Sequence, residues 1–176
     1  MEKMGQYLDQ MRETDGHIYQ LAGLNECYHC QYARKMWVNT HYLEEMGVEV
    51  PQTTEEFYEV CKKFVETYPD KIAIGGASSG WYVDFVAWLM GSFTLDSGAY
   101  GKLALTPDGE IVSAATTEEW REGLRYIKSL YDIGAIYDGN FTQDAEQLRT
   151  IMNQEDVPVL FVPFGTISDG IDSDSN

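Results

Sequence analysis

A chain of 176 residues with 44% hydrophobic and 23% charged residues has enough apolar material for one globular domain. Its 29 acidic residues outnumber its 12 basic ones and give a formal net charge of −17, which argues against nucleic acid and anionic membrane surfaces as partners. No apolar run approaches the roughly 20 residues of a membrane-spanning helix, and the polar first residues do not resemble a signal peptide. We interpret the acidity as that of a soluble exposed surface.

The beginning of the chain predicts short elements. Residues 4–12 favour a short helix and residues 17–21 a strand. A second extended stretch is expected over about 32–39. A helix over 40–46 should follow and end at Gly47, because glycine suits the left-handed position after a helix.

The helix after Pro51 has the clearest signals. Thr53 and Glu56 have the spacing of a capping box, and Pro69 should end the helix. A short buried strand is expected next, over residues 72–74. The predicted apolar face of the helix comprises Phe57, Cys61, Phe64, Val65 and Tyr68.

The middle of the chain predicts a loop, a buried helix and a hairpin. Small residues over 75–80 form the loop, and the strongly apolar segment from Trp81 to about Phe93 predicts a buried helix. The hairpin would pair residues 103–105 with 111–112 across a turn at 107–109.

A further helix is expected to begin after a cap at Thr116 or Thr117, to extend to Tyr131 and to be followed by Gly134. Its inner face is predicted to carry Trp120, Leu124, Ile127 and Tyr131.

The last predicted elements are a helix over 143–153 and an apolar strand over 157–163. The acidic tail, residues 169–176, has little to bury and should be loose. Helices and strands thus alternate through most of the chain, which predicts a layered α/β domain.

Cys27 and Cys30 have the spacing of redox and metal-binding motifs. A redox thiolate needs a helix N-terminus, but a strand is expected after this pair. A zinc site needs further ligands, and Cys61, His17 and His41 are not paired at ligand spacing. We therefore predict no metal and no cofactor here, and favour structural packing or a local disulfide.

The loop over 78–80 and the residues after it form a candidate binding feature. The loop matches neither a phosphate-binding loop nor a nucleophile elbow, so it is either a binding loop at the end of a strand or a plain connector. Trp81 and Tyr82 can stack on a sugar ring while Asp84 accepts hydrogen bonds from hydroxyls. The alternative is that Trp81 begins a buried helix and packs in the core.

Several segments resemble the family 1 bacterial extracellular solute-binding proteins. Residues 15–21 are similar to that family's DGKIYGLP segment, and residues 25–30 lead through a hinge to 35–39, which resemble its MW(I/V)N strand. Residues 47–57 are similar to its G(L/V)..P.T..EF segment. The resemblance covers nearly the whole chain and is most specific in the first 60 residues. Gln20-Leu21-Ala22 replaces the usual Gly-Leu-Pro, which predicts a less rigid hinge.

This resemblance implies a type II periplasmic-binding-protein fold, with residues 1–176 as a single α/β lobe whose mixed sheet is flanked by helices. Residues 1–25 would lie near the hinge, and a missing second lobe of the same protein would complete the cleft. It implies a membrane-anchored extracellular lipoprotein, with an ABC permease as its partner.

The implied function is non-enzymatic binding of a small solute, a sugar, for import. Alternatives are a sensor or interaction module, a thiol redox enzyme that uses Cys27 and Cys30, or a glycosidase whose carboxylates no sequence feature selects. The predicted ligand-binding residues are Asn25, Glu26 and His29 near the hinge, Ser79, Trp81, Tyr82 and Asp84 on the loop, and Phe164 after the last strand.

Overall fold

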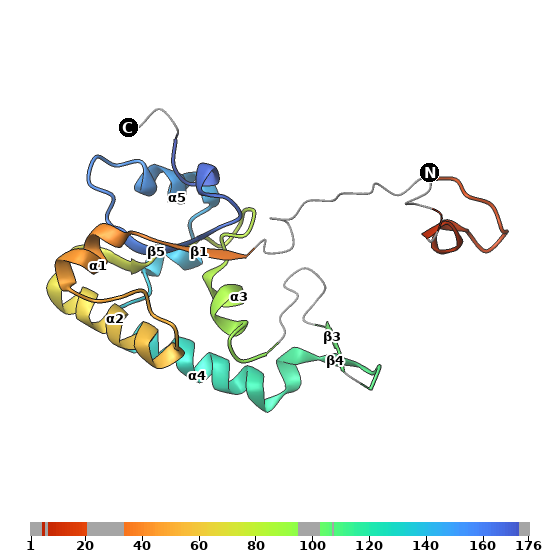
Figure 1. The fold of residues 1–176 in the computed structure, drawn as a ribbon, viewed down its shortest axis with the longest axis horizontal. Helices are drawn as coiled ribbons and strands as arrows, with labels where there is room; N and C mark the ends of the chain where they lie inside the picture. The colour runs from red at the N-terminus through yellow and green to blue at the C-terminus, as the bar shows by residue number, and fades with distance from the viewer. Residues whose placement is uncertain (1–4, 6, 21–33, 95–102, 107, 173–176) are drawn as a thin grey trace. The chain divides into compact units, whose positions relative to one another are not determined.

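The computed structural model describes residues 5, 7–20, 34–94, 103–106 and 108–172 (Figure 1). The chain divides into two compact units, residues 1–32 and residues 33–176. We call the second the α/β unit.

The described part of the first unit differs from the predicted helix and strand. The described residues of the predicted helix form 3-10 turns, including η2 (Asp9–Met11), and no α-helix. Residues 17–20 are irregular, because Asp15 instead organises a turn. Its carboxylate accepts hydrogen bonds from the His17 backbone at 2.9 Å and from the Tyr19 hydroxyl at 2.6 Å.

The α/β unit is built on a mixed three-stranded sheet with the order β1-β5-β2. Strand β1 (Lys35–Val38) is antiparallel to β5 (Val159–Phe164), and β2 (Ile72–Ile74) is parallel to it. All six residues of β5 are buried, as expected for a central strand. The predicted strands are confirmed, although β5 begins and ends slightly later than expected.

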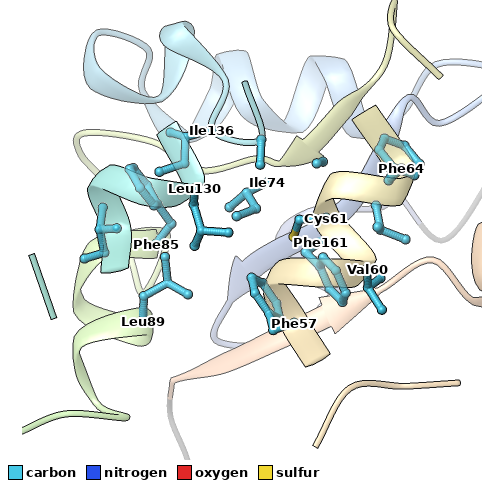
Figure 2. Close-up of a cluster of buried hydrophobic side chains, with 14 of the residues drawn as sticks. Phe57, Val60, Cys61, Phe64, Ile74, Phe85, Leu89, Leu130, Ile136 and Phe161 are labelled. Atoms are coloured by element: carbon cyan, nitrogen blue, oxygen red, sulfur yellow. The ribbon is translucent and has the colours of Figure 1, made fainter. Parts of the chain in front are cut away.

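Two apolar clusters lie against this sheet. The larger one joins the first four helices to Ile74 and Phe161, and Figure 2 shows Phe57 and Cys61 facing Phe161. The smaller cluster joins the last helix to the other side chains of β5. In Figure 1 helix α5 (Ala145–Met152) accordingly lies on the opposite side of the strands from α1 (Thr40–Met46) and α2 (Thr54–Thr67).

Helices α1 (Thr40–Met46) and α2 (Thr54–Thr67) form as the sequence predicts. Gly47 follows α1 with a φ of 64°, and the capping box at the start of α2 is present. The buried face of α2 differs from the prediction in that it includes Val60, while Val65 is half-buried.

Helix α3 (Phe85–Met90) begins four residues later than predicted. The reason is Asp84, whose side chain accepts hydrogen bonds from the backbone N–H groups of Val86 and Ala87 and so caps the helix at its own position. Trp81 consequently precedes the helix.

Helix α4 (Glu118–Asp132) is capped by Thr117, and its inner face was predicted in part: Ile127 is buried and Trp120 packs against the larger cluster, but Leu124 and Tyr131 do not face inward. Leu130 is fully buried, whereas Leu124 and Tyr131 expose 46% and 48% of their surface. The inner face includes Gly123, against which the Met90 side chain of α3 packs. Glycine is not counted as apolar in a hydrophobic pattern. The pattern therefore favoured Leu124 and Tyr131, each one position after the residue that is buried, Gly123 or Leu130.

Helix α5 (Ala145–Met152) and the hairpin of β3 (Leu103–Leu105) and β4 (Ile111–Ser113) are also confirmed. Short 3-10 turns complete the unit: η4 (Ala114–Thr116), η5 (Asp138–Phe141) and η6 (Ile167–Asp169). In the described part of the chain no helix is long and apolar enough to cross a bilayer.

The segment that ends at Asp172 is not loose, in contrast to the expectation for the tail. Asn153 donates a hydrogen bond to the Gly170 carbonyl at 2.9 Å and accepts one from the Asp172 backbone at 2.8 Å. Arg149 pairs with the Asp172 carboxylate. The rest of the predicted tail, residues 173–176, lies outside the described residues.

Candidate functional site

An open pocket of about 400 Å³ lies where the loop after β2 meets β1, the end of β5 and α3. Three of the predicted ligand-binding residues, Trp81, Tyr82 and Asp84, line it. The complete lining comprises Arg34, Lys35, Ser78, Gly80, Trp81, Tyr82, Asp84, Ala87, Trp88 and Pro163.

The loop that carries these residues is held at both ends. The Gly75 N–H donates to the Phe161 carbonyl of β5 at 2.8 Å, and the backbone N–H and hydroxyl of Ser78 both donate to the Gln143 carbonyl at 2.9 Å. Gln143 is buried, and its side-chain amide donates to the Gly76 carbonyl at 2.5 Å. The first residues of the loop are therefore anchored both to β5 and to the segment before Asp144.

Trp81 is the most exposed aromatic side chain of the pocket wall, with 55% of its surface accessible. This exposure agrees with the prediction for a binding loop and contradicts the alternative that Trp81 packs in the core. The Tyr82 ring lies 4.9 Å from the Trp81 ring, tilted by 60°. Tyr82 has a φ of 55°, a left-handed value that non-glycine residues rarely adopt and that is frequent at functional sites.

Asp84 is exposed and lines the pocket, but it also caps α3. Its Oδ1 accepts the N–H groups of Val86 and Ala87 at 2.9 and 3.3 Å. These hydrogen bonds fix the orientation of the carboxylate at the pocket rim.

The sequence analysis missed the cationic side of the pocket. Arg34 donates to the Ala87 carbonyl at 3.4 Å, and the Lys35 ammonium donates to the Gly165 carbonyl at 2.7 Å. Both residues reach the pocket because β1 pairs with β5, where Lys35 stands opposite Phe164. The only sequence signal was a pair of adjacent basic residues within the extended stretch predicted over 32–39, in an otherwise acidic chain.

Phe164 was predicted to contact ligand, and the structure places its side chain elsewhere. It is 1% exposed and belongs to the smaller apolar cluster. Its contribution to this region is through its backbone carbonyl, which accepts a hydrogen bond from Trp37 Nε1 at 3.2 Å. The strand therefore ends in the core, and Gly165 after it is still buried.

Among the remaining predicted ligand-binding residues, the structure describes only Ser79. Ser79 is exposed and forms an isolated bridge with Asp144, beside the pocket lining. Asn25, Glu26 and His29 lie outside the described residues, as do Cys27 and Cys30.

Cys61 is a buried free cysteine in the larger apolar cluster, where burial raises the pKa of its thiol. Within the described residues, no three side chains of histidine, cysteine, aspartate or glutamate gather as a metal site would require.

Comparison with solved structures identifies the fold. The chain superposes with a TM-score of 0.79 and 22% identity on the Streptococcus pneumoniae ABC-transporter substrate-binding protein FusA, solved in complex with kestose, over 96% of this chain and 36% of that one. An extracellular solute-binding protein from Bifidobacterium longum subsp. infantis gives a TM-score of 0.75 at 22% identity, over 97% and 37% of the two chains. The predicted periplasmic-binding-protein type of fold is thereby confirmed.

Sequence comparison identifies the family. The sequence model of the bacterial extracellular solute-binding proteins matches residues 4–173, and the chain belongs to that family. FusA of S. pneumoniae serotype 4, a fructooligosaccharide ABC transporter substrate-binding protein, is 24% identical over 155 residues, which cover 82% of this chain and 28% of FusA. Lipoprotein LipO of Bacillus subtilis is 30% identical over 109 residues, 57% of this chain and 21% of LipO. The chain thus spans little more than a third of FusA even in the structural superposition, and about a fifth of LipO in the sequence alignment.

Proposed function

We propose that this chain supplies one wall of an oligosaccharide-binding site in an extracellular protein that delivers its ligand to an ABC importer. The observation that carries the proposal is the half-exposed Trp81 on the wall of an open pocket, in a member of a solute-binding family. Relatives support a sugar as the solute, because FusA is named for fructooligosaccharides and was solved with kestose.

The pocket has the two kinds of groups that sugar recognition uses. The indole of Trp81 and the ring of Tyr82 offer apolar faces for the C–H face of a pyranose or furanose ring. Asp84 accepts hydrogen bonds from hydroxyl groups, and charged partners make such bonds stronger than neutral ones. The charged side chains of Arg34, Lys35 and Asp84 interrupt the apolar part of the lining, which disfavours a wholly hydrophobic ligand.

The pocket is open, so one wall alone buries only part of a ligand. We infer that the remaining contacts come from another part of a longer protein, which closes over the solute by a hinge movement and presents the closed form to the permease. The name of LipO, a lipoprotein, supports a membrane-anchored location on the outer surface of the cell.

A titration of the ¹⁵N-labelled 176-residue chain with kestose tests the proposal, because nuclear magnetic resonance detects weak binding. We expect a saturable shift of the Trp81 indole N–H signal, with a Kd in the millimolar range, which corresponds to about −4 kcal/mol. Trp81→Ala lacks this signal, so its titration is followed on the backbone amide signals of the other pocket residues; binding should be weaker by roughly 1–3 kcal/mol, so that these signals no longer saturate.

Tyr131→Ala is the matched control, since Tyr131 is an equally exposed aromatic residue on α4 and does not line the pocket. It should leave the titration unchanged. The absence of shifts with kestose, stachyose and other oligosaccharides would contradict the proposal, as would binding that Trp81→Ala does not weaken. Micromolar binding by this chain alone would refute the need for a second wall.

A further inference from the structure

We infer that Gly165 is a positioning residue for Trp81: the absence of a side chain at position 165 gives the indole the place from which it faces the pocket. The expected effect of Gly165 on sugar binding rests on the proposed function. Its expected effect on the position of the Trp81 indole does not depend on any ligand.

The indole of Trp81 occupies the space that a side chain at position 165 would fill. A Cβ built on Gly165 would lie 2.6 Å from Cζ3, 2.8 Å from Cε3 and 3.1 Å from Cη2 of Trp81. These three nearest atoms all belong to the six-membered ring of the indole. One part of the ring therefore lies directly on the backbone at the end of β5, while 55% of the side chain stays exposed.

The backbone itself does not require glycine at this position. Gly165 is not among the glycines with a positive φ, so an alanine can adopt its conformation. Gly80, on the same pocket wall, is different: its φ is 135°, and a Cβ there would meet the Ala145 Cβ at 2.5 Å. A substitution at Gly165 should thus disturb the Trp81 indole without straining the backbone at position 165.

When a methyl group is added at position 165, the ring must move, because the strand end is held more tightly. The Lys35 ammonium donates to the Gly165 carbonyl at 2.7 Å, and Trp37 Nε1 donates to the Phe164 carbonyl at 3.2 Å. Both donors come from β1, and both Phe164 and Gly165 are buried. Trp81 has solvent on its outer side, so rotation of its side chain is the cheaper response.

The consequence is a specific loss of ring orientation. Stacking on a sugar requires the indole face to be parallel to the sugar ring at contact distance. A rotated indole therefore loses most of this interaction even though the tryptophan side chain is still there. Gly165→Ala should therefore imitate Trp81→Ala in binding while it leaves the core unchanged.

A double-mutant cycle tests the inference with Gly165→Ala, Trp81→Ala and the double variant. In Gly165→Ala the Trp81 indole N–H signal should shift before any ligand is added. Gly165→Ala should lower the melting temperature when Trp81 is present. In the Trp81→Ala background it should not, because the added methyl group there meets empty space in the folded state and restricts the unfolded chain. Kestose affinity should fall roughly 5- to 150-fold in Gly165→Ala, with no further loss in the double variant.

Gly170→Ala is the matched control for a glycine covered by an aromatic ring, because the ring that a Cβ would meet there is the buried Phe164. It should lower the melting temperature equally with and without Trp81. Equal effects of Gly165→Ala in both backgrounds, or an unshifted indole signal, would overturn the inference. If the parent chain does not bind kestose, the proposed function fails, while the signal shift and the melting cycle still decide the role of Gly165.

Discussion

Leu130 and Leu124 lie on the same helix and provide a matched pair that tests its orientation. Leu130 is fully buried in the larger apolar cluster, where Figure 2 places it near Phe85 and Ile74. Leu124 exposes 46% of its surface. Replacement by alanine removes the same atoms and keeps the same helix propensity cost in both cases, so the difference between the two variants reports burial alone.

The expected magnitudes differ several-fold. Leu→Ala removes three carbon atoms, which at about 0.8 kcal/mol for each buried methylene gives roughly 2.4 kcal/mol. The cavity left in a well-packed core adds to this, so Leu130→Ala should lower the free energy of unfolding by about 2–5 kcal/mol. Leu124 is half-exposed and leaves no closed cavity, and its replacement should cost about 1 kcal/mol or less.

Urea unfolding followed by far-ultraviolet circular dichroism measures both values, provided that the slope with denaturant stays the same in all variants. An equal loss for the two variants would refute the packing of α4 described above. A larger loss for Leu124→Ala would support the face that the hydrophobic pattern predicts, with Leu124 and Tyr131 inward.

Two further predictions concern ionisable groups. Burial raises the pKa of the Cys61 thiol, which makes it a poor nucleophile in the folded protein. In a Cys27→Ser, Cys30→Ser background, iodoacetamide at pH 8 should therefore modify Cys61 only when the protein unfolds. Rapid modification of the native protein would contradict this. A hydrogen bond from Lys71 at 2.6 Å lowers the pKa of Asp156. Its stabilising effect is therefore present above the unfolded pKa of about 3.9 and is lost as the pH falls through the folded pKa. Asp156→Asn should lower the melting temperature slightly at pH 7 and leave it unchanged at pH 2; a similar decrease at both pH values would argue against the pair.

The elements that the sequence predicted well are those with local signals. The capping box of Thr53 and Glu56, the left-handed Gly47 after α1 and the cap at Thr117 all lie where expected, because each involves residues within one helical turn. The alternation of these helices with apolar strands was sufficient to predict the α/β class.

One error concerns a local cap inside an apolar run, and the other depends on a distant contact. The apolar run from Trp81 suggested one long helix, but Asp84 is a short polar residue within it and caps the chain there. The inner face of α4 depends on Gly123, which becomes a contact surface only because Met90 of α3 packs against it. Neither fact follows from the period of the apolar residues.

The candidate site likewise combines residues that a local pattern reveals with residues that only the strand pairing brings in. Trp81, Tyr82 and Asp84 are consecutive enough to be recognised as one loop, and the structure places all three on one pocket wall. Arg34 and Pro163 reach the same wall only through the antiparallel pairing of β1 with β5, which no local pattern in the sequence specifies.

Gly165 is the strongest example of this dependence. It has an ordinary backbone conformation, it does not belong to a turn motif, and its significance comes only from an indole carried by a loop far away in the sequence. The loop fixes where the Trp81 backbone lies, through the hydrogen bonds of Ser78 and Gly75. The end of β5, held by Lys35, provides the surface on which the ring rests. The orientation of the proposed stacking side chain is therefore determined jointly by two segments, and a change in either should alter binding without altering the fold.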